Sequence, residues 1–347
     1  MYYLIRTKKG KVLATDLPPE LLEEAKLFSK KFSSELCSIK GVNKRQGIIE
    51  RDNFIFYLCC FDQKKTNRIF KHQLDASECF LIAYKDTYIE MAETERKKTR
   101  RLKHNLSTYS TKIHQELYKL LPQDKISKGR QNQRELVKSI LEKNPDHAVT
   151  TFLRILKNAN LIKAEFDVYD ILHEANPHID SQKHSIHRVL TLSLSSFWLD
   201  FLDKGITINM EKCVGEMTFD YKSMSSILCH IFDNATKYIA PDSEFKIYVE
   251  DDGEYYNITF DMISLRVQEA ELKKIFDDGF SSDYSERLGF AGTGVGMNVI
   301  KRLSKLNEFR VLFKRNVDPT KTITKMNIPF DQNILILGIN KTPPNIL

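Results

Sequence analysis

The chain has 347 residues, a formal net charge of +7 and 41% hydrophobic residues. This length predicts two or three domains, and the apolar content is enough for ordinary buried cores, which excludes a disordered chain. The small excess of basic residues is spread along the sequence and mainly favours solubility, so a nucleic-acid partner is not expected.

The cysteines and the apolar runs indicate a cytoplasmic protein. The six cysteines have no metal-ligand spacing such as C-x-x-C, and they are expected to be reduced thiols. The longest apolar run, Phe54 to Phe61, is far shorter than the roughly 20 residues that span a bilayer. No signal-peptide pattern precedes this run, so no membrane partner is expected.

Residues 1–90 are predicted to form a small α/β domain. A helix is expected from about Pro19 to Phe32, and short strands near Tyr2–Arg6, Lys11–Ala14, Gly47–Arg51 and Phe54–Phe61. This part of the sequence contains no motif that carries chemistry. Its role as a sensor or docking domain is a hypothesis that rests on position alone.

Residues 91–180 are predicted to form two antiparallel helices. The first begins near Ala92, ends at Pro122 and carries one apolar stripe with spacings of three and four. The members of this stripe are Leu102, Leu106, Tyr109, Ile113, Leu117 and Leu120. Asn144-Pro145 predicts the start of the last helix of this region, which carries a second stripe. Because a single hairpin cannot bury both stripes, we expect a homodimer with a four-helix bundle.

Residues 181–330 are predicted to form an α/β sandwich, in which helices cover one face of a mixed sheet. Helices are expected at His184–Lys204 and Tyr221–Ala240, and strands at Ile206–Glu211, Glu216–Phe219, Glu244–Asp251, Tyr255–Ile263, Phe309–Arg315 and Thr322–Phe330. Residues 331–347 are a C-terminal tail without an assigned structure. The fold class is therefore α+β: an N-terminal α/β domain, a helical hairpin and a sandwich.

A glycine-rich turn, Gly292-Thr293-Gly294-Val295-Gly296-Met297, precedes a predicted helix. Small residues let backbone amides approach phosphate oxygens, and the helix that begins there contributes its positive end. Such turns are common before helices, so this one does not identify a phosphate site by itself.

The order of three features resembles the N, F and G2 boxes of the GHKL nucleotide-binding family, and most of all the sensor histidine kinases. These features are Asn234 in a helix, a loop centred on Phe276, and the glycine-rich turn. The resemblance covers about residues 92–330. It implies that Asn234 binds the Mg²⁺ that bridges the phosphates of ATP, and that Lys237 and Tyr238 flank the nucleotide. A buried Asn can instead be a structural hydrogen-bonding residue.

The nucleotide-binding residues that the resemblance implies come from the helix, the strand after it, the loop and the turn. They are His230, Asn234, Lys237, Tyr238, Met262, Ser264, Phe276, Gly292, Thr293, Gly294, Val295, Gly296 and Met297. The polar connection from Ser281 to Ala291 is similar to the lid of these kinases, although short polar loops are often only connections.

Two of these positions depart from the family pattern. His230 stands where histidine kinases have Asn and where gyrase-like relatives have a water-activating Glu, so steady ATP hydrolysis of their kind is disfavoured. Met262 stands where the family's G1 box has an Asp that accepts a hydrogen bond from adenine. Losing that bond costs on the order of 1.5–3 kcal/mol, so weak binding or relaxed base choice is expected. Ser264 compensates in part, whereas Asp261 points to the opposite face of the strand.

His104 is the candidate phosphoacceptor. It lies about 200° round the helix from Leu102 and therefore faces away from the apolar stripe, as does Thr108. The run from His104 to Thr108 resembles the H box of histidine kinases, except that Asn105 replaces the acidic residue. Because a His with a pKa of about 6.5 is mostly neutral at pH 7, Asn105 is expected to orient the ring rather than remove a proton. Thr108 is expected to orient the water that dephosphorylates the partner. An exposed His on a basic helix is otherwise unremarkable.

The leading hypothesis is a cytoplasmic, homodimeric, histidine-kinase-like enzyme. It binds ATP and Mg²⁺, autophosphorylates on His104 and passes the phosphoryl group to an Asp of a response regulator. One alternative is a pseudokinase that acts as a nucleotide sensor or a scaffold for a partner protein. The other is a phosphotransferase that accepts phosphate on His104 without using ATP.

Overall fold

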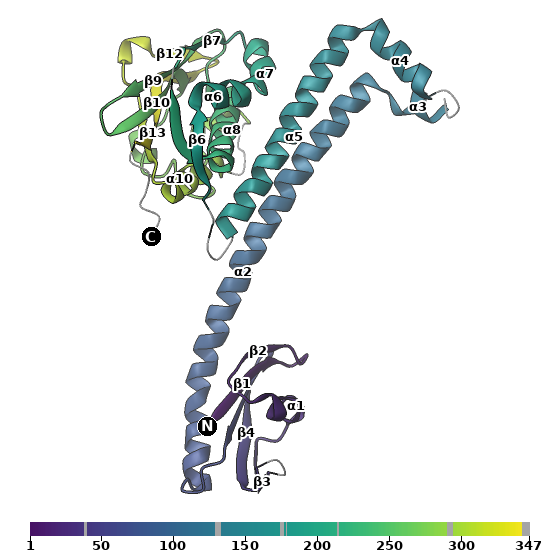
Figure 1. The fold of residues 1–347 in the computed structure, drawn as a ribbon, viewed down its shortest axis with the longest axis vertical. Coiled ribbons are helices and arrows are strands. Elements are labelled where there is room, and N and C mark those ends of the chain that lie inside the picture. Colours follow the sequence, from purple (N-terminus) through teal and green to yellow (C-terminus); the bar gives the residue numbers. More distant parts are fainter. Residues whose placement is uncertain are drawn as a thin grey trace. The chain divides into compact units, whose positions relative to one another are not determined.

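A computed structural model describes residues 1–37, 40–128, 133–173, 177, 179–213, 215–289 and 294–341. The chain divides into two compact units, Met1–Thr99 and Arg100–Leu347 (Figure 1). Within the described part of the chain, no helix has both the length and the apolar character needed to cross a membrane.

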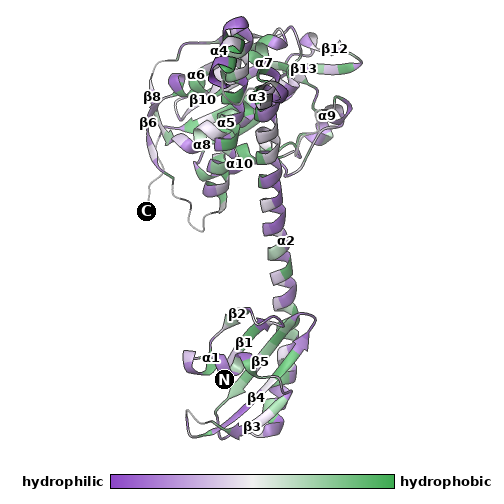
Figure 2. Ribbon diagram, turned by 90° about the vertical axis from the view of Figure 1, so that its right-hand side faces the viewer, coloured by the Kyte–Doolittle hydropathy of each residue, from purple (hydrophilic) through white to green (hydrophobic). Residues whose placement is uncertain are grey.

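The first unit is built on a five-stranded antiparallel sheet with the strand order β2-β1-β5-β4-β3. Its elements are β1 (Tyr2–Thr7), β2 (Val12–Thr15), α1 (Pro19–Leu27), β3 (Phe32–Leu36), β4 (Asn43–Arg51), β5 (Phe54–Cys60) and the start of α2 (Asn67–Leu120). The central strand β5 is apolar and buried along its whole length (Figure 2). Helix α1 contributes side chains to one apolar cluster on this sheet, and α2 contributes to a second, separate cluster.

Two predictions for this region were wrong. The long helix was expected to begin near Ala92, but α2 begins at Asn67 and its first turns pack on the sheet through Phe70, Leu74 and Leu81. The strand β3 was missed, and the predicted helix ends at Leu27 rather than Phe32. The sequence Phe-Ser-Ser-Glu-Leu of β3 lacks a clear apolar alternation because this strand lies at an edge of the sheet.

The second unit begins with a helical hairpin. It contains the rest of α2, α3 (Gln123–Lys128), α4 (Gln133–Lys143) and α5 (Pro145–His173). The side chain of Asn144 accepts a hydrogen bond from the backbone N–H of His147 (3.2 Å), so the predicted start of this helix is confirmed. The antiparallel helices α2 and α5 lie side by side, and Glu116 is paired with Arg154 (3.6 Å) (Figure 1).

The rest of this unit is an α/β sandwich around one large core. Its first half comprises β6 (Ser181–Ser185), α6 (Ile186–Ser195), α7 (Trp198–Asp203), β7 (Thr207–Met210), β8 (Glu216–Asp220) and α8 (Tyr221–Tyr238). Its second half comprises β9 (Glu244–Asp251), β10 (Tyr255–Leu265), α9 (Asp283–Arg287), α10 (Gly296–Leu306), β11 (Arg310–Lys314), β12 (Ile323–Lys325) and β13 (Ile328–Asn340). The main sheet has the order β11-β13-β10-β9-β7, with β12 beside β13, and its inner side chains share the core with α6, α8 and α10. The predicted sandwich and the α+β class are confirmed.

The predicted C-terminal tail is partly wrong, because β13 continues to Asn340 and pairs with β10 along the whole of that strand. The apolar run Ile334-Leu335-Ile336-Leu337 was a strand signal that the sequence analysis did not use. The helix expected at His184–Lys204 is in fact β6, α6 and α7. Ser185 ends β6 and caps α6 by accepting a hydrogen bond from the N–H of Arg188.

Candidate functional site

A cavity of about 200 Å³ lies in the second unit. Its described lining comes from α8, from β10, from the loop before α9, from the start of α10, and from the helical hairpin. Ten of the predicted nucleotide-binding residues line it: His230, Asn234, Lys237, Tyr238, Met262, Ser264, Gly294, Val295, Gly296 and Met297. Gly292 and Thr293 lie outside the described residues, as does Ala291 at the end of the predicted lid.

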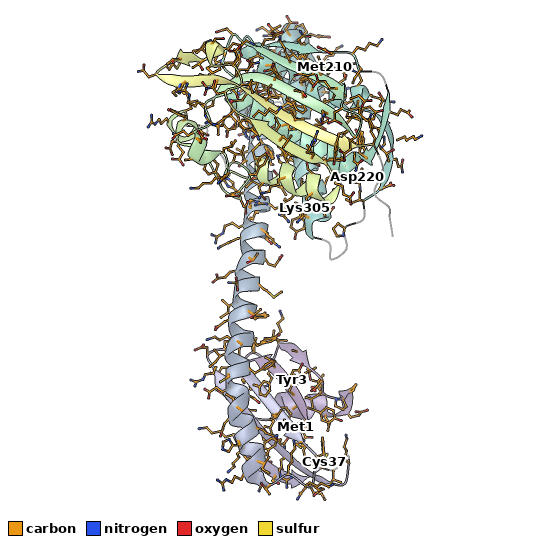
Figure 3. The ribbon with its side chains drawn as sticks, turned by 90° about the vertical axis from the view of Figure 1, so that its left-hand side faces the viewer. Met1, Tyr3, Cys37, Met210, Asp220 and Lys305 are labelled. Carbon is orange, nitrogen blue, oxygen red and sulfur yellow. The ribbon has the colours of Figure 1, made fainter. Side chains whose placement is uncertain are left out.

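Helix α8 positions the first of these side chains. Asp220, the last residue of β8 (Figure 3), caps the helix by accepting a hydrogen bond from the N–H of Ser223 (2.7 Å). Asn234 lies near the other end of α8, against the start of α10. A Cβ atom added at Gly296 would lie 3.2 Å from Nδ2 of Asn234, so the two segments are in contact. Within the described part of the chain, the amide of Asn234 has no hydrogen-bond partner, so it can serve a ligand.

The glycine turn and the Phe-centred loop are joined to each other. Gly294 has φ +64°, and a Cβ atom there would lie 2.5 Å from the carbonyl oxygen of Phe280. The N–H of Gly279 donates to the carbonyl of Gly294 (3.2 Å), and the amide of Asn298 donates to the carbonyl of Phe276 (3.0 Å). Phe276 itself does not line the cavity, whereas Phe280 does. The Phe-centred loop therefore supports the turn mainly through its backbone.

Lys237 forms a short ion pair with Asp233 one turn earlier on α8. Burial alone would raise the pKa of Asp233 and lower that of Lys237, but their mutual attraction outweighs it. The pKa of Asp233 is therefore lowered and that of Lys237 is raised, so both groups stay charged. The side chain of Lys237 is 38% exposed, which leaves its ammonium group accessible to an anionic ligand. Sequence reasoning missed Asp233, although its spacing of four from Lys237 was a usable signal.

The β10 side of the cavity lacks the expected acceptor for adenine. Met262 lines the cavity and is 8% exposed, and the hydroxyl of Ser264 accepts a hydrogen bond from the amide of Asn333 (2.9 Å). Asp261 points elsewhere, as predicted, because both of its oxygens accept from Gln332 (2.9 and 3.0 Å). Among the described lining residues, β10 contributes no carboxylate.

The helical hairpin supplies three further lining residues, Asn105 and Tyr109 from α2 and Glu165 from α5. The side-chain amide of Asn105, which is 9% exposed, donates to Oε1 of Glu165 (2.9 Å). The prediction that Asn105 orients the ring of His104 is therefore not supported, because its hydrogen bond crosses the hairpin instead. No sequence signal marked Glu165, since only the packing of α2 on α5 brings it to the cavity.

The predicted phosphoacceptor is exposed, as its position on the helix suggested, and it is absent from the described lining of the cavity. The hydroxyl of Thr108 donates to the backbone carbonyl of His104 (2.9 Å). Arg101, one turn before His104, donates to Asp278 in the Phe-centred loop (2.7 Å), which ties α2 to the site.

His230 is 7% exposed, and its Nε2 atom has no hydrogen-bond partner in the residues that the structure describes. Burial lowers the pKa of the imidazole, with the charges of Glu165 and Asp233 opposing it, so the ring is neutral at pH 7. A buried polar atom left unpaired costs about 1–3 kcal/mol, so a ligand atom or a water molecule is expected beside it.

These residues fit the phosphate end of a nucleotide with its metal ion. The unpaired amide of Asn234, the N-terminus of α10 and the ammonium of Lys237 can all bind phosphate or Mg²⁺. The described residues contain no cluster of His, Cys, Asp and Glu that would hold a metal alone. Mg²⁺ would therefore need phosphate oxygens as ligands besides Asn234, which agrees with its usual chemistry.

A mixed sheet covered by helices on one face, with a cavity between α8 and the start of α10, is an arrangement that fits a nucleotide-binding domain. Residues 219–332 match the family described as histidine kinase-, DNA gyrase B- and HSP90-like ATPase, so this part of the chain is a domain of that family. The predicted resemblance to the GHKL family is therefore confirmed for this region.

Solved structures with a similar arrangement include histidine kinases. The catalytic domain of histidine kinase ThkA is 14% identical and covers 47% of this chain and 99% of its own, with a TM-score of 0.37. The Acinetobacter baumannii histidine kinase AdeS is 13% identical and covers 69% of this chain and 98% of its own, with a TM-score of 0.38. Histidine kinase ThkA in complex with the response regulator protein TrrA is 11% identical and covers 99% of this chain and 97% of its own, with a TM-score of 0.42. No curated protein sequence matches this chain.

Proposed function

We propose that this protein is a histidine-kinase-like enzyme that binds ATP with Mg²⁺ and transfers the γ-phosphoryl group to His104. The observation that carries this proposal is that Asn234 and the glycine turn meet at one cavity, which α2, the helix of His104, also lines. The family match of residues 219–332 supports nucleotide binding at this cavity.

The residues of the cavity have distinct roles in this reaction. The amide oxygen of Asn234 would hold Mg²⁺, which would neutralise charge along the phosphates, and the ammonium of Lys237 would add a second positive charge. The described part of the turn, Gly294 to Met297, would present backbone amides to phosphate oxygens. A ring nitrogen of His104 forms a bond to the γ-phosphorus, while the bond from that phosphorus to the bridging oxygen breaks and ADP leaves. Catalysis rests mainly on positioning and charge.

The acceptor and the cavity are supplied by different copies of the chain in this proposal. His104 is exposed and is not part of the described wall of its own cavity. Helix α5 also exposes an apolar face, formed by Val149, Phe152, Leu153 and Leu156. Burying this face against a second copy in a four-helix bundle is the economical arrangement, and in such a dimer the cavity of the second copy would serve His104.

The phosphoryl group on His104 would pass to an Asp of a response regulator. The exposed position of His104 on α2 supports access by such a partner. Thr108 is one turn away, but its hydroxyl is already bonded to the backbone of α2, so a role in orienting water requires it to rotate. The cytoplasmic location expected from the sequence stays a prediction.

The test is incubation of the full chain with γ-labelled ATP and Mg²⁺. We expect acid-labile label on the protein, which is lost in His104→Ala and in Asn234→Ala but kept in the control His114→Ala. His114 lies on the same helix and is exposed, so the control removes an imidazole without touching the cavity. Label that persists in His104→Ala would contradict the assignment of the phosphoacceptor.

The non-enzymatic alternative is favoured by one observation, the absence of a carboxylate on the β10 side of the described cavity. A nucleotide sensor would bind ATP measurably and acquire no label. Label that is acquired only from a phosphorylated response regulator would instead indicate an ATP-independent phosphotransferase.

A further inference from the structure

The helical hairpin contributes a carboxylate to the proposed nucleotide cavity. Glu165 lies on α5, is 9% exposed, and lines the same cavity as Asn234 and Gly296. It belongs to no motif, and the phosphotransfer reaction above does not use it. A buried carboxylate is costly unless it is hydrogen-bonded or has a function, so this residue requires an explanation.

Asn105 fixes the orientation of this carboxylate. Its buried amide donates to Oε1 of Glu165 at 2.9 Å, from the neighbouring helix α2. The second oxygen, Oε2, has no hydrogen-bond partner among the residues for which positions are described. One oxygen is therefore held in place, and the other is available to a molecule in the cavity.

His230 lines the same cavity as Glu165 and is affected by the negative charge of that carboxylate. The negative charge of Glu165 acts on the imidazole of His230, and the Nε2 atom of this ring is buried without a described partner. An unpaired carboxylate oxygen and an unpaired imidazole nitrogen therefore share one cavity. A water molecule is the smallest ligand that can hydrogen-bond to both, by donating to the carboxylate and bonding to the ring.

His230 is one helical turn before Asn234 on α8, so a water molecule bound to both Glu165 and His230 would lie at the end of the cavity where the phosphates are proposed to bind. We propose that Glu165 is a general base for ATP hydrolysis in this cavity, and that Asn105 is its positioning residue. The inference rests on the proposed nucleotide site, but not on phosphorylation of His104.

The oxygen of the water forms a bond to the γ-phosphorus, and Glu165 accepts the proton that this water loses. The bond between the γ-phosphorus and the bridging oxygen breaks, and ADP leaves with the electron pair. Glu165 then returns the proton to solvent. General-base catalysis of this kind contributes roughly 10²–10⁴-fold in rate.

In the described arrangement, α2 presents Asn105 and Tyr109 to the cavity, and the salt bridge from Arg101 to Asp278 helps to hold α2 there.

The experiment measures phosphate release by the full chain with ATP and Mg²⁺, in a His104→Ala background in which no phosphohistidine can form on that residue. In this background, Glu165→Gln is expected to lower phosphate release about 100-fold and to leave the affinity for ATP, measured by calorimetry, within about twofold. Asn105→Ala is expected to give a smaller loss, about tenfold, because it frees the carboxylate without removing it. The control is Asp170→Asn, an exposed carboxylate on α5 that does not line the cavity.

The outcomes separate the two proposals. Phosphate release that is equal in Glu165→Gln and in its parent overturns this inference. Labelling of His104 in the wild type without phosphate release from the His104→Ala chain overturns it too, but leaves the kinase proposal intact. Glu165-dependent phosphate release from a protein that is never labelled supports the inference and contradicts the kinase. Failure to bind ATP contradicts both. Because Gln keeps the hydrogen bond from Asn105, urea unfolding without nucleotide is expected to be nearly unchanged.

Discussion

The two sides of the cavity are built in different ways. The proposed phosphate side, formed by α8 and the described turn residues Gly294 to Met297, offers backbone amides, a helix N-terminus and Asn234. The nucleobase side, formed by β10, depends on side chains. There Met262 and the hydroxyl of Ser264, which is already bonded to Asn333, stand where a carboxylate acceptor was expected. A site made of backbone tolerates sequence change better than one made of a single side chain. The phosphate side can therefore be retained while the preference for adenine over other nucleobases weakens.

The largest expected effect comes from a substitution that distorts the backbone of the phosphate side. Gly294→Ala forces a side chain into a left-handed conformation and within 2.5 Å of the backbone of Phe280. We expect a loss of about 3 kcal/mol in the free energy of unfolding, measured with urea. The control Gly253→Ala also has a positive φ but open space within 4 Å among the described atoms, and it should lose only about 1 kcal/mol. Equal losses in the two variants would argue against the steric role of Gly294.

The second effect removes the proposed ligand for Mg²⁺. Asn234→Ala is expected to weaken binding of ATP with Mg²⁺ about 100-fold, because a hydrogen bond or metal contact to a charged group is lost. Calorimetry in the presence of Mg²⁺ measures this change. Asn209→Ala, an exposed residue on β7, is the matched control and should bind ATP as the wild type does. Affinity that stays unchanged in Asn234→Ala would show that this amide is only structural.

The third prediction sharpens the comparison by placing a carboxylate on the nucleobase side of the cavity. In Met262→Asp, a carboxylate on β10 is expected to favour ATP over GTP about tenfold, whereas the wild type should bind the two with similar affinity. The stability without nucleotide should fall, because a carboxylate then replaces a buried thioether. Competition between the two nucleotides gives the ratio. Met326→Asp, at an exposed position, should leave both quantities unchanged.

The smallest effect concerns the pH dependence of stability. The pKa of His230 is lowered in the folded state, mainly by burial, so below its ordinary value of 6.5 the unfolded chain binds a proton that the folded chain does not. Stability should therefore fall as the pH decreases from 6.5 towards the lowered pKa. The charges that face the ring are Glu165 from α5, Asp233 and Lys237 from α8, and Arg101 from α2. Urea unfolding at several pH values should show a flatter acid limb in His230→Gln than in His114→Gln.

Much of the second unit was readable from the sequence because its signals are local. The strands β9 and β10 were predicted close to their observed bounds, and Asn144-Pro145 gave the start of α5. The strands β3 and β6 were missed because they are short and largely polar, and pairing with neighbours stabilises them rather than their own composition. The extension of β13 was missed because its apolar run was not weighed as a strand.

The amino-acid sequence by itself determined the glycine turn, the helix that carries Asn234 and the outward position of His104, because each depends on residues within a few turns of one another. Only the tertiary structure decided that Asn105 bonds to Glu165 and that both face the cavity with His230, because these contacts join α2, α5 and α8 across long stretches of chain. Side-chain contacts between distant helices depend on how the helices pack, and helix packing has no short sequence motif.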